Sequence, residues 1–295
     1  MIGLFDSGTG GLTILQAARR LLPGESFTYL GDHARMPYGE MSGGDVVSAT
    51  GEMVEKLFDE GCNLVVLACN TASSIALRTL QETWLADHYP ERRVLGILVP
   101  MVENLTGLQW DRRNPGLSDK PEQTVAVFAT RRTVESGAYV EEIVKRAPSF
   151  KIHQQACPGI ASLIEAGVPK EDIAFLVGKY VGELMDREGL EHLDGVILGC
   201  THYPLVEDLF REALPPGTRI ASQPAIVARA LQDYLSRHPE FGAAGGKEGE
   251  ATGGKDGAGG GDGEPALKLL TTGDPEALNA VAAAWLGGDF HFERA

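Results

Sequence analysis

Two segments of this chain share one local pattern, and that pattern constrains the fold more than any other feature. Residues 195–204 read GVILGCTHYP, and residues 64–73 read LVVLACNTAS. Each has a short apolar run typical of a buried strand, then a small residue, a cysteine (Cys200 or Cys69), a polar pair and a helix start. Open α/β sheets bind ligands where the carboxyl ends of parallel strands meet helix amino termini. The pattern therefore predicts two thiols that face one another across a shared cleft.

The remainder of the chain alternates short apolar runs with amphipathic stretches of helical length. Strands are expected at residues 2–5, 27–30, 64–67, 94–99, 125–128, 151–155, 196–198, 219–221 and from 267 onward. A strand–helix alternation of this kind implies parallel sheets with helices on both faces. The pattern restarts near residue 125, which indicates an internal repeat. We therefore predict an α/β fold of two pseudo-symmetric, doubly wound lobes with parallel sheets, and an active site in the cleft between them.

The domain boundaries follow from this repeat. The first lobe is expected to comprise residues 1–98 and 208–295, because the last strands and helices are predicted to rejoin it, and the second lobe residues 99–207. Residues 241–263 are glycine-rich and lack apolar anchors, so they are predicted to form a flexible surface insertion. A binding role for this insertion is the alternative.

Composition narrows the classes of partner. The chain carries 26 basic and 41 acidic side chains, a net charge of −15, which argues against nucleic acid because no basic excess exists to neutralise phosphates. It begins without a basic-then-apolar leader and contains no apolar stretch of membrane-spanning length, so a cytoplasmic protein that does not enter membranes is expected. The four cysteines are never paired as C-x-x-C, which indicates free thiols in a reducing compartment.

Cys69 and Cys200 are the candidate chemical groups. A thiolate is the reactive form of cysteine, and a helix amino terminus or a protonated histidine favours it. His202 is placed to exchange a proton with Cys200, and Asp6 with Cys69 if their strands are neighbours. An isolated cysteine is more often a core residue, but two in matching contexts favour a functional role. A zinc site is not predicted, because of the three candidate ligands only Cys200 and His202 are close in sequence.

The glycine-rich loop at residues 6–11 admits two interpretations. It lacks the Lys-Ser/Thr of a phosphate-binding P-loop, and Thr13 stands where a dinucleotide fingerprint requires glycine. The loop either offers backbone N–H groups to an anion or forms a tight turn with Asp6 or Ser7 as helix cap.

Further polar residues cluster at predicted helix starts, where each alone would be an ordinary cap. Together they would supply hydroxyl and amide donors suited to carboxylates; they are Asn70, Thr71, Thr130, Thr133 and Thr201. Tyr38 and Gly39 end a proline-containing loop that is expected to close over the cleft. From the residues alone, Glu165 is expected to be a surface acid, and His33, His153 and Cys62 are expected to be structural.

Seven motifs, in this order, resemble glutamate racemase, the family that makes D-glutamate for peptidoglycan. They are FDSGTGGLT, GDHARMPYG, ACNTAS, ATRRTVESGAY, ACPGIASLIEAG, LGCTHYPL and TTGDPEAL, and they extend over nearly the whole chain apart from the glycine-rich insertion. The resemblance implies a cofactor-independent racemase with two bases, commonly a homodimer. Some positions depart from the family pattern: Val99-Pro100-Met101 replaces E-P-G, Ala221 replaces the Asp of a D-S pair, and His33 replaces a threonine.

The resemblance also implies roles for individual residues. Cys69 and Cys200 would be the two bases, assisted by Asp6 and His202 respectively, and Glu165 falls where the family has an acid near the second cysteine. The substrate, glutamate, would be held by Asp6, Ser7, Tyr38, Gly39, Asn70, Thr71, Thr130, Thr133, Thr201 and His202.

Two alternatives remain. A racemase or decarboxylase of the same superfamily could act on another acid such as aspartate, although a decarboxylase would need only one functional cysteine. A non-catalytic carboxylate-binding protein would retain Thr71 and Thr201 but has no need of two matched thiols.

Overall fold

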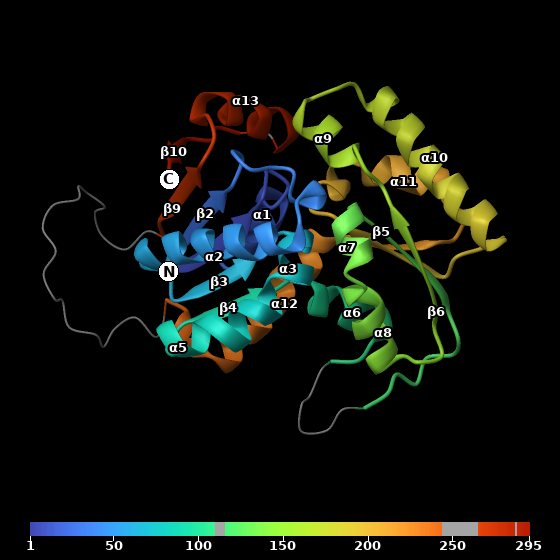
Figure 1. Ribbon diagram of the computed structural model, residues 1–295, viewed down its shortest axis with the longest axis horizontal. Coiled ribbons are helices and arrows are strands. Elements are labelled where there is room, and N and C mark those ends of the chain that lie inside the picture. The colour runs from blue at the N-terminus through green and yellow to red at the C-terminus, as the bar shows by residue number, and fades with distance from the viewer. Residues whose placement is uncertain (110–115, 244–264, 287) are drawn as a thin grey trace, which may run out of the picture.

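Two lobes lie side by side, each built on its own sheet, and both chain termini belong to the first lobe (Figure 1). The structure is a computed structural model that describes residues 1–109, 116–243, 265–286 and 288–295. The first sheet has the strand order β10-β9-β2-β1-β3-β4 and the second the order β6-β5-β7-β8, with parallel pairing throughout. The predicted α/β class with two parallel sheets is confirmed.

The strands of the first sheet are β1 (Ile2–Asp6), β2 (Phe27–Gly31), β3 (Leu64–Leu67), β4 (Arg93–Gly96), β9 (Leu267–Thr271) and β10 (Phe292–Arg294). One face is covered by α1 (Leu12–Leu21), α12 (Gln223–Arg237) and α13 (Pro275–Leu286). The other is covered by α2 (Gly43–Asp59), α3 (Asn70–Ile75), α4 (Leu77–Thr79), the π-helical turn Leu80–Leu85 and α5 (Ala86–His88). Short 3₁₀ turns occur at Tyr38–Glu40 and Pro239–Phe241.

The strands of the second sheet are β5 (Thr124–Ala129), β6 (Lys151–Ala156), β7 (Gly195–Gly199) and β8 (Arg219–Ala221). On one face lie α6 (Leu98–Thr106) and α8 (Ala138–Arg146), and on the other α9 (Ile160–Glu165), α10 (Lys170–Glu188) and α11 (Glu207–Ala213). The short helix α7 (Arg131–Glu135) follows β5, and a 3₁₀ turn at Tyr203–Val206 follows β7.

Alternation along the central strands explains why each sheet has helices on both faces. In β5, Val125 and Val127 pack with α6 and α8, whereas Ala126 and Phe128 pack with α10 and α11. Successive side chains of a strand point to opposite faces, so a continuous apolar run is buried only between two helical layers.

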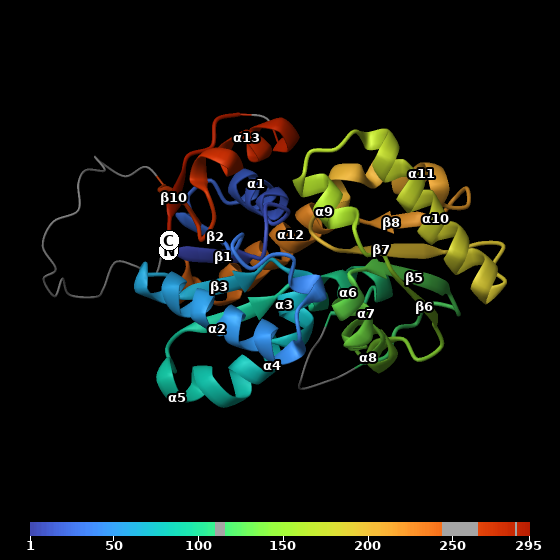
Figure 2. The same ribbon diagram turned by 45° about the horizontal axis from the view of Figure 1, so that its top comes forward.

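The structure corrects the predicted boundary at residue 208. Strand β8 pairs with β7, with Ala221 beside Ile197, so residues 208–221 belong to the second lobe. The chain returns to the first lobe with α12, whose Val227 and Leu231 pack in the core beneath β1 and α1. Figure 2 shows α12 at the junction of the two lobes. The sequence of a three-residue strand does not indicate which sheet it will join. Its membership is decided by the strand with which it pairs, here β7.

The predicted strand at 94–99 is also wrong in its second half. Strand β4 ends at Gly96, and α6 begins at Leu98 with Pro100 in its first turn. A proline is tolerated there because the first helical N–H groups have no partner within the helix. A short apolar run does not by itself distinguish a buried strand from the start of a buried helix.

The glycine-rich insertion begins later than predicted. Phe241 is buried and packs in the core of the first lobe, with Arg93 over its ring. Residues 244–264, which hold the remainder of the predicted insertion, lie outside the described residues. The short terminal strand β10, which pairs with β9, was not predicted.

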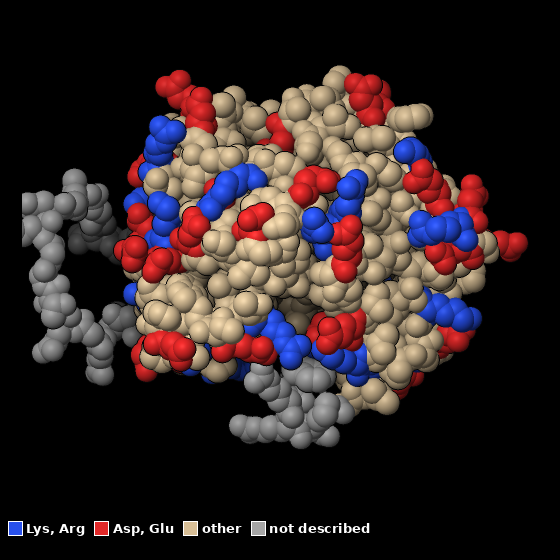
Figure 3. Space-filling view, viewed as in Figure 1, with Lys and Arg blue, Asp and Glu red and all other residues tan. Residues whose placement is uncertain are grey.

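The face of the molecule seen in Figure 3 carries side chains of both charges. On the face seen in Figure 3, acidic and basic side chains are interspersed, and its described residues form no continuous basic stripe of the kind that tracks a nucleic-acid backbone. Within the ranges that the structure describes, no helix has both the length and the apolar content needed to cross a bilayer.

Candidate active site

The two cysteine strands bring their thiols into one cavity between the lobes. Cys69 follows β3 of the first sheet and Cys200 follows β7 of the second, and both side chains line the same small cavity. Most other predicted site residues also line it, namely Ser7, Tyr38, Gly39, Asn70, Thr71, Thr130, Thr201 and His202. The three predicted residues that do not line it, Asp6, Thr133 and Glu165, hydrogen-bond to residues that do.

The cavity is closed in this conformation. Its volume is about 30 Å³, enough for one or two water molecules. Ligand pockets for small molecules generally measure roughly 300–1,000 Å³. A ligand of that size therefore requires a more open cavity than this conformation provides.

Cys69 has a hydroxyl and a backbone N–H around its sulfur. The N–H of Ala72 donates to Sγ at 3.5 Å, as the helix cap of α3, and Ser7 Oγ lies 3.4 Å from Sγ. Burial, together with the nearby charge of Asp6, raises the pKa of the Cys69 thiol to about 12. Cys69 is therefore a thiol in this closed conformation.

Asp6 organises the glycine-rich loop. Its carboxylate accepts from the N–H of Ser7 at 2.8 Å, the N–H of Gly11 at 2.5 Å and the hydroxyl of Thr201 at 3.1 Å. The side chain of Asp6 therefore takes up two of the loop's own N–H donors, as in the tight-turn alternative, but the N-cap residue of α1 is Gly11 and neither Asp6 nor Ser7. Burial raises the pKa of Asp6 to about 6, although the charge of His202 and the two backbone N–H groups oppose that rise. Asp6 lies close enough to Cys69 for its charge to act on the thiol.

On the other side of the cavity, Cys200, His202 and Glu165 form a chain of adjacent titratable side chains. Cys200 Sγ lies 3.7 Å from His202 Nδ1, and His202 Nε2 lies 2.5 Å from Glu165 Oε1. The His202 and Glu165 side chains are only 6% and 8% exposed, so the expectation that Glu165 is a surface acid is wrong. The N–H of Thr9, from the first lobe, also donates to Glu165 at 2.6 Å.

The ion pair sets the charge of this chain of groups. Burial by itself would raise the pKa of Glu165, but the His202 charge and its hydrogen bond outweigh burial and lower that pKa to about 2. Burial would likewise lower the pKa of His202, yet Glu165 and Cys200 raise it well above its ordinary value. At neutral pH, His202 is an imidazolium held between the Glu165 carboxylate and the sulfur of Cys200.

Three threonine hydroxyls meet across the cleft beside the thiols. Thr71 Oγ1 lies 3.0 Å from Thr130 Oγ1 and 3.3 Å from Thr133 Oγ1, and the hydroxyl of Thr130 accepts from the N–H of Thr133 as the cap of α7. Hydroxyls that rotate freely can all donate to one anion. This cluster is suited to a carboxylate.

Tyr38 and Gly39 form one wall of the cavity. The Tyr38 hydroxyl donates to Asp32 at 2.5 Å, so the phenol is already engaged within the first lobe. A side chain at Gly39 would lie only 2.8 Å from Cβ of Thr130, which explains why only glycine fits there. The side-chain amide of Asn70 is engaged by Gln223 and Tyr139.

Sequence reasoning missed three fully buried side chains that complete this region, Asp32, Tyr139 and Gln223. Asp32 directly follows β2 at the edge of the sheet where Asp6 ends β1, so the strand-end rule could have found it. Gln223 begins α12 just after β8, so the same rule could have found it, whereas Tyr139 lies within α8 and carries no such local signal. All four cysteines are buried and free, and the described residues contain no cluster of metal-ligating side chains.

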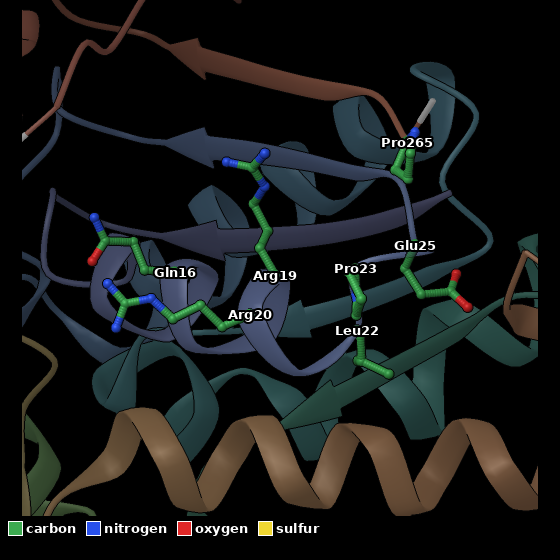
Figure 4. Close-up of a pocket in the computed structure, with 7 residues that line it drawn as sticks. All are labelled: Gln16, Arg19, Arg20, Leu22, Pro23, Glu25 and Pro265. Carbon is green, nitrogen blue, oxygen red and sulfur yellow. The ribbon is translucent and has the colours of Figure 1, made fainter. Parts of the chain in front are cut away.

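A larger hollow lies elsewhere, near the carboxyl end of α1 (Figure 4). It measures about 570 Å³ and is lined by Gln16, Arg19, Arg20, Leu22, Pro23, Glu25 and Pro265. Arg19 and Arg20 are exposed and extend in different directions, and none of these lining residues is a cysteine or histidine. Cys69, Cys200 and His202 all line the smaller cavity between the lobes.

Known proteins share this sequence and architecture from end to end. Residues 12–230 match the Asp/Glu/Hydantoin racemase family. A glutamate racemase of Phenylobacterium zucineum is 42% identical over 300 residues, which cover 100% of this chain and 99% of the relative. A glutamate racemase structure from Bacillus anthracis superposes with a TM-score of 0.80 at 28% identity, covering 100% of this chain and 97% of the other. One from Francisella tularensis, in complex with D-glutamate, gives 0.79 at 26% identity, with 100% and 96% covered.

The identity to the Phenylobacterium protein extends over the whole chain, and the family match includes both cysteine segments. This chain therefore belongs to the Asp/Glu/Hydantoin racemase family and, within it, to the glutamate racemases.

Proposed function

We propose that this protein interconverts L-glutamate and D-glutamate by moving the α-proton between two cysteines, without a cofactor, and that it supplies D-glutamate for peptidoglycan. One observation carries the proposal: two buried thiols, one from each lobe, line a single cavity, and each has its own acid partner nearby. The D-glutamate in the Francisella relative supports the choice of substrate.

The reaction needs one base and one acid on opposite faces of the α-carbon. A thiolate removes the α-proton and becomes a thiol, which leaves a carbanion at the α-carbon. The second thiol then protonates the other face and becomes the thiolate. Cys69 and Cys200 lie on different lobes, so each is assigned one face of a substrate held between them.

Neighbouring groups prepare each thiol for its role. As an imidazolium, His202 can donate from Nδ1 to the Cys200 sulfur and so favour its thiolate, while Glu165 holds Nε2. A substrate ammonium held near the Asp6 carboxylate would reduce the repulsion between the charge of Asp6 and a Cys69 thiolate. The threonine cluster and the helix starts offer donors to the α-carboxylate, where negative charge grows in the transition state.

Separate Cys69→Ser and Cys200→Ser variants test this function. Racemisation, followed by circular dichroism on L-glutamate without added cofactor, should collapse in both, because a serine hydroxyl is a far weaker base than a thiolate. A glutamate analogue with a β-leaving group should still undergo elimination, from one enantiomer in each variant and from opposite enantiomers in the two. If both variants process the same enantiomer, or either retains full racemisation, the two-base mechanism is wrong. Parallel assays on aspartate would reveal the alternative substrate.

We also infer that the protein is a cytoplasmic homodimer, as the family resemblance implies. Light scattering after size-exclusion chromatography should give twice the 31.5 kDa of the chain. A mass of one chain would contradict the dimer, and activity in a membrane or periplasmic fraction would contradict the location.

A further inference from the structure

Three buried polar side chains meet at the junction of the lobes, outside the set that transfers protons. Asn70 begins α3 directly after Cys69, Tyr139 lies in α8 of the second lobe, and Gln223 begins α12 where the chain returns to the first lobe. Their exposed fractions are 2%, 0% and 0%. We call these residues the junction cluster.

The junction cluster is closely hydrogen-bonded. The amides of Asn70 and Gln223 pair reciprocally: Asn70 Nδ2 donates to Gln223 Oε1 at 3.0 Å, and Gln223 Nε2 donates to Asn70 Oδ1 at 2.7 Å. The hydroxyl of Tyr139 donates to the same Asn70 oxygen at 2.7 Å. The two reciprocal hydrogen bonds fix the planes of both side-chain amides. The hydroxyl of Tyr139 adds a third hydrogen bond, from the second lobe.

Tyr139 also touches the turn that carries the other thiol. A Cβ placed on Gly199, the residue before Cys200, would lie 3.2 Å from Cε2 of Tyr139, so the ring packs directly on this turn. Its hydroxyl meanwhile binds the side chain of the residue after Cys69. One rigid aromatic side chain therefore contacts both thiol-bearing turns, and Gln223 holds the far side of the same amide.

We propose that Tyr139 and Gln223 are positioning residues that set the separation and alignment of the Cys69 and Cys200 thiols. This inference rests on the proposed two-cysteine function. Neither residue lines the cavity, so neither is expected to touch substrate. Their effect should be confined to the step that needs both thiols correctly placed at once.

Two reactions in deuterated water separate this role from a simple loss of folded protein. Racemisation requires both thiols. Exchange of the α-proton with retention requires only one thiol: its thiolate removes the proton, the resulting S–H exchanges with deuterated water, and the S–D returns a deuteron to the same face. Proton NMR measures total exchange, and circular dichroism measures racemisation in the same sample. The ratio of retained exchange to racemisation is independent of how much enzyme is folded.

Tyr139→Phe removes one hydroxyl and keeps the ring on Gly199, while Gln223→Met removes the amide and keeps its length. We expect each to slow racemisation on the order of 10- to 100-fold, the scale of a sub-ångström to 1 Å misplacement of reacting groups. We expect the ratio of retained exchange to racemisation to rise at least about fivefold. A misplaced thiol slows the reaction that needs both thiols more than the reaction that needs only one. Tyr180→Phe is the matched control, because this buried tyrosine donates its hydroxyl to the Pro158 carbonyl at 2.8 Å instead. Its ratio should equal that of the wild type.

The outcomes are distinguishable. Suppose that the wild type is active and that both variants keep its ratio, even if exchange and racemisation are slowed by the same factor. This result overturns the positioning role and leaves the proposed function standing. If Gln223→Met fails to fold, the ratio in Tyr139→Phe decides alone. A wild type that neither exchanges nor racemises glutamate overturns the proposed function, and the positioning role with it.

Discussion

Glu165→Gln tests the chain of groups behind Cys200 more sharply than any other single change. The substitution keeps the size of the side chain and an oxygen that can accept from Thr9 N–H and from His202. What it removes is the negative charge beside a buried imidazolium. Its consequences should therefore be electrostatic, and they should appear in both stability and kinetics.

The magnitude for stability follows from the pKa of Glu165, which is lowered from 4.5 to about 2. Each pKa unit corresponds to about 1.4 kcal/mol, so this carboxylate contributes about 3 kcal/mol to the free energy of unfolding. A lowered carboxyl pKa gives stability that is present above pH 4.5 and is lost as the pH falls through about 2. The raised pKa of His202 gives stability that is fully present below pH 6.5 and is lost as the pH rises through its folded-state value. The pair is therefore at full strength between about pH 4.5 and 6.5.

Urea unfolding at pH 6 should show Glu165→Gln destabilised by about 3 kcal/mol, and the difference should shrink at pH 3.5. Glu207→Gln is the matched control, because Glu207 forms an ion pair of 2.6 Å with Arg211 on an exposed helix surface. Such surface pairs contribute roughly 0–1 kcal/mol. A Glu165 variant as stable as the control would show that the buried ion pair does not form.

Kinetics locate the effect at one thiol. Without Glu165, burial favours neutral His202, and proton transfer at Cys200 should slow by roughly 10²-fold. The ratio kcat/KM must fall equally for both enantiomers, because their solution equilibrium constant is one. The primary isotope effect on α-deuterated glutamate should instead rise for the enantiomer deprotonated at Cys200 and fall toward unity for the other. If both isotope effects move in the same direction, Glu165 does not act through Cys200.

Three further perturbations address the rest of the chain. Thr71→Val and Thr201→Val should each weaken substrate binding or turnover with little change in melting temperature, and wild-type kinetics would remove that hydroxyl from the site. Deleting residues 244–263 and joining the ends should change kcat/KM by less than about tenfold, or about 1.4 kcal/mol. A deletion that abolishes activity would refute the assignment of these residues as an insertion. By contrast, Phe241→Ala should lower the free energy of unfolding by about 3 kcal/mol. Because the pKa of Asp6 is raised to about 6, kcat/KM should decrease as the pH is lowered through about 6. This decrease should be absent in Asp6→Asn. A variant that keeps it would show that another group is responsible.

Local sequence determined the fold class and the placement of both thiols. A short apolar run that ends in Cys69 or Cys200 and leads into a helix has few structural solutions. Within a parallel sheet, all such strand ends open on the same edge. The threonines at the starts of α3 and α7 were predictable for the same reason, since helix starts that follow parallel strands lie beside that edge. These inferences needed only the period of apolar residues and the chemistry of helix termini.

Tertiary structure alone decided which distant groups became partners. Glu165 is 37 positions from His202 along the chain, and only the packing of α9 brings its carboxylate into a buried ion pair. The membership of β8 in the second sheet depended on its pairing with β7, and the roles of Tyr139 and Gln223 on the contact between two lobes. Such contacts depend on the free energy of burying one surface against another. A local pattern records that a surface is apolar or polar, but not which surface will cover it.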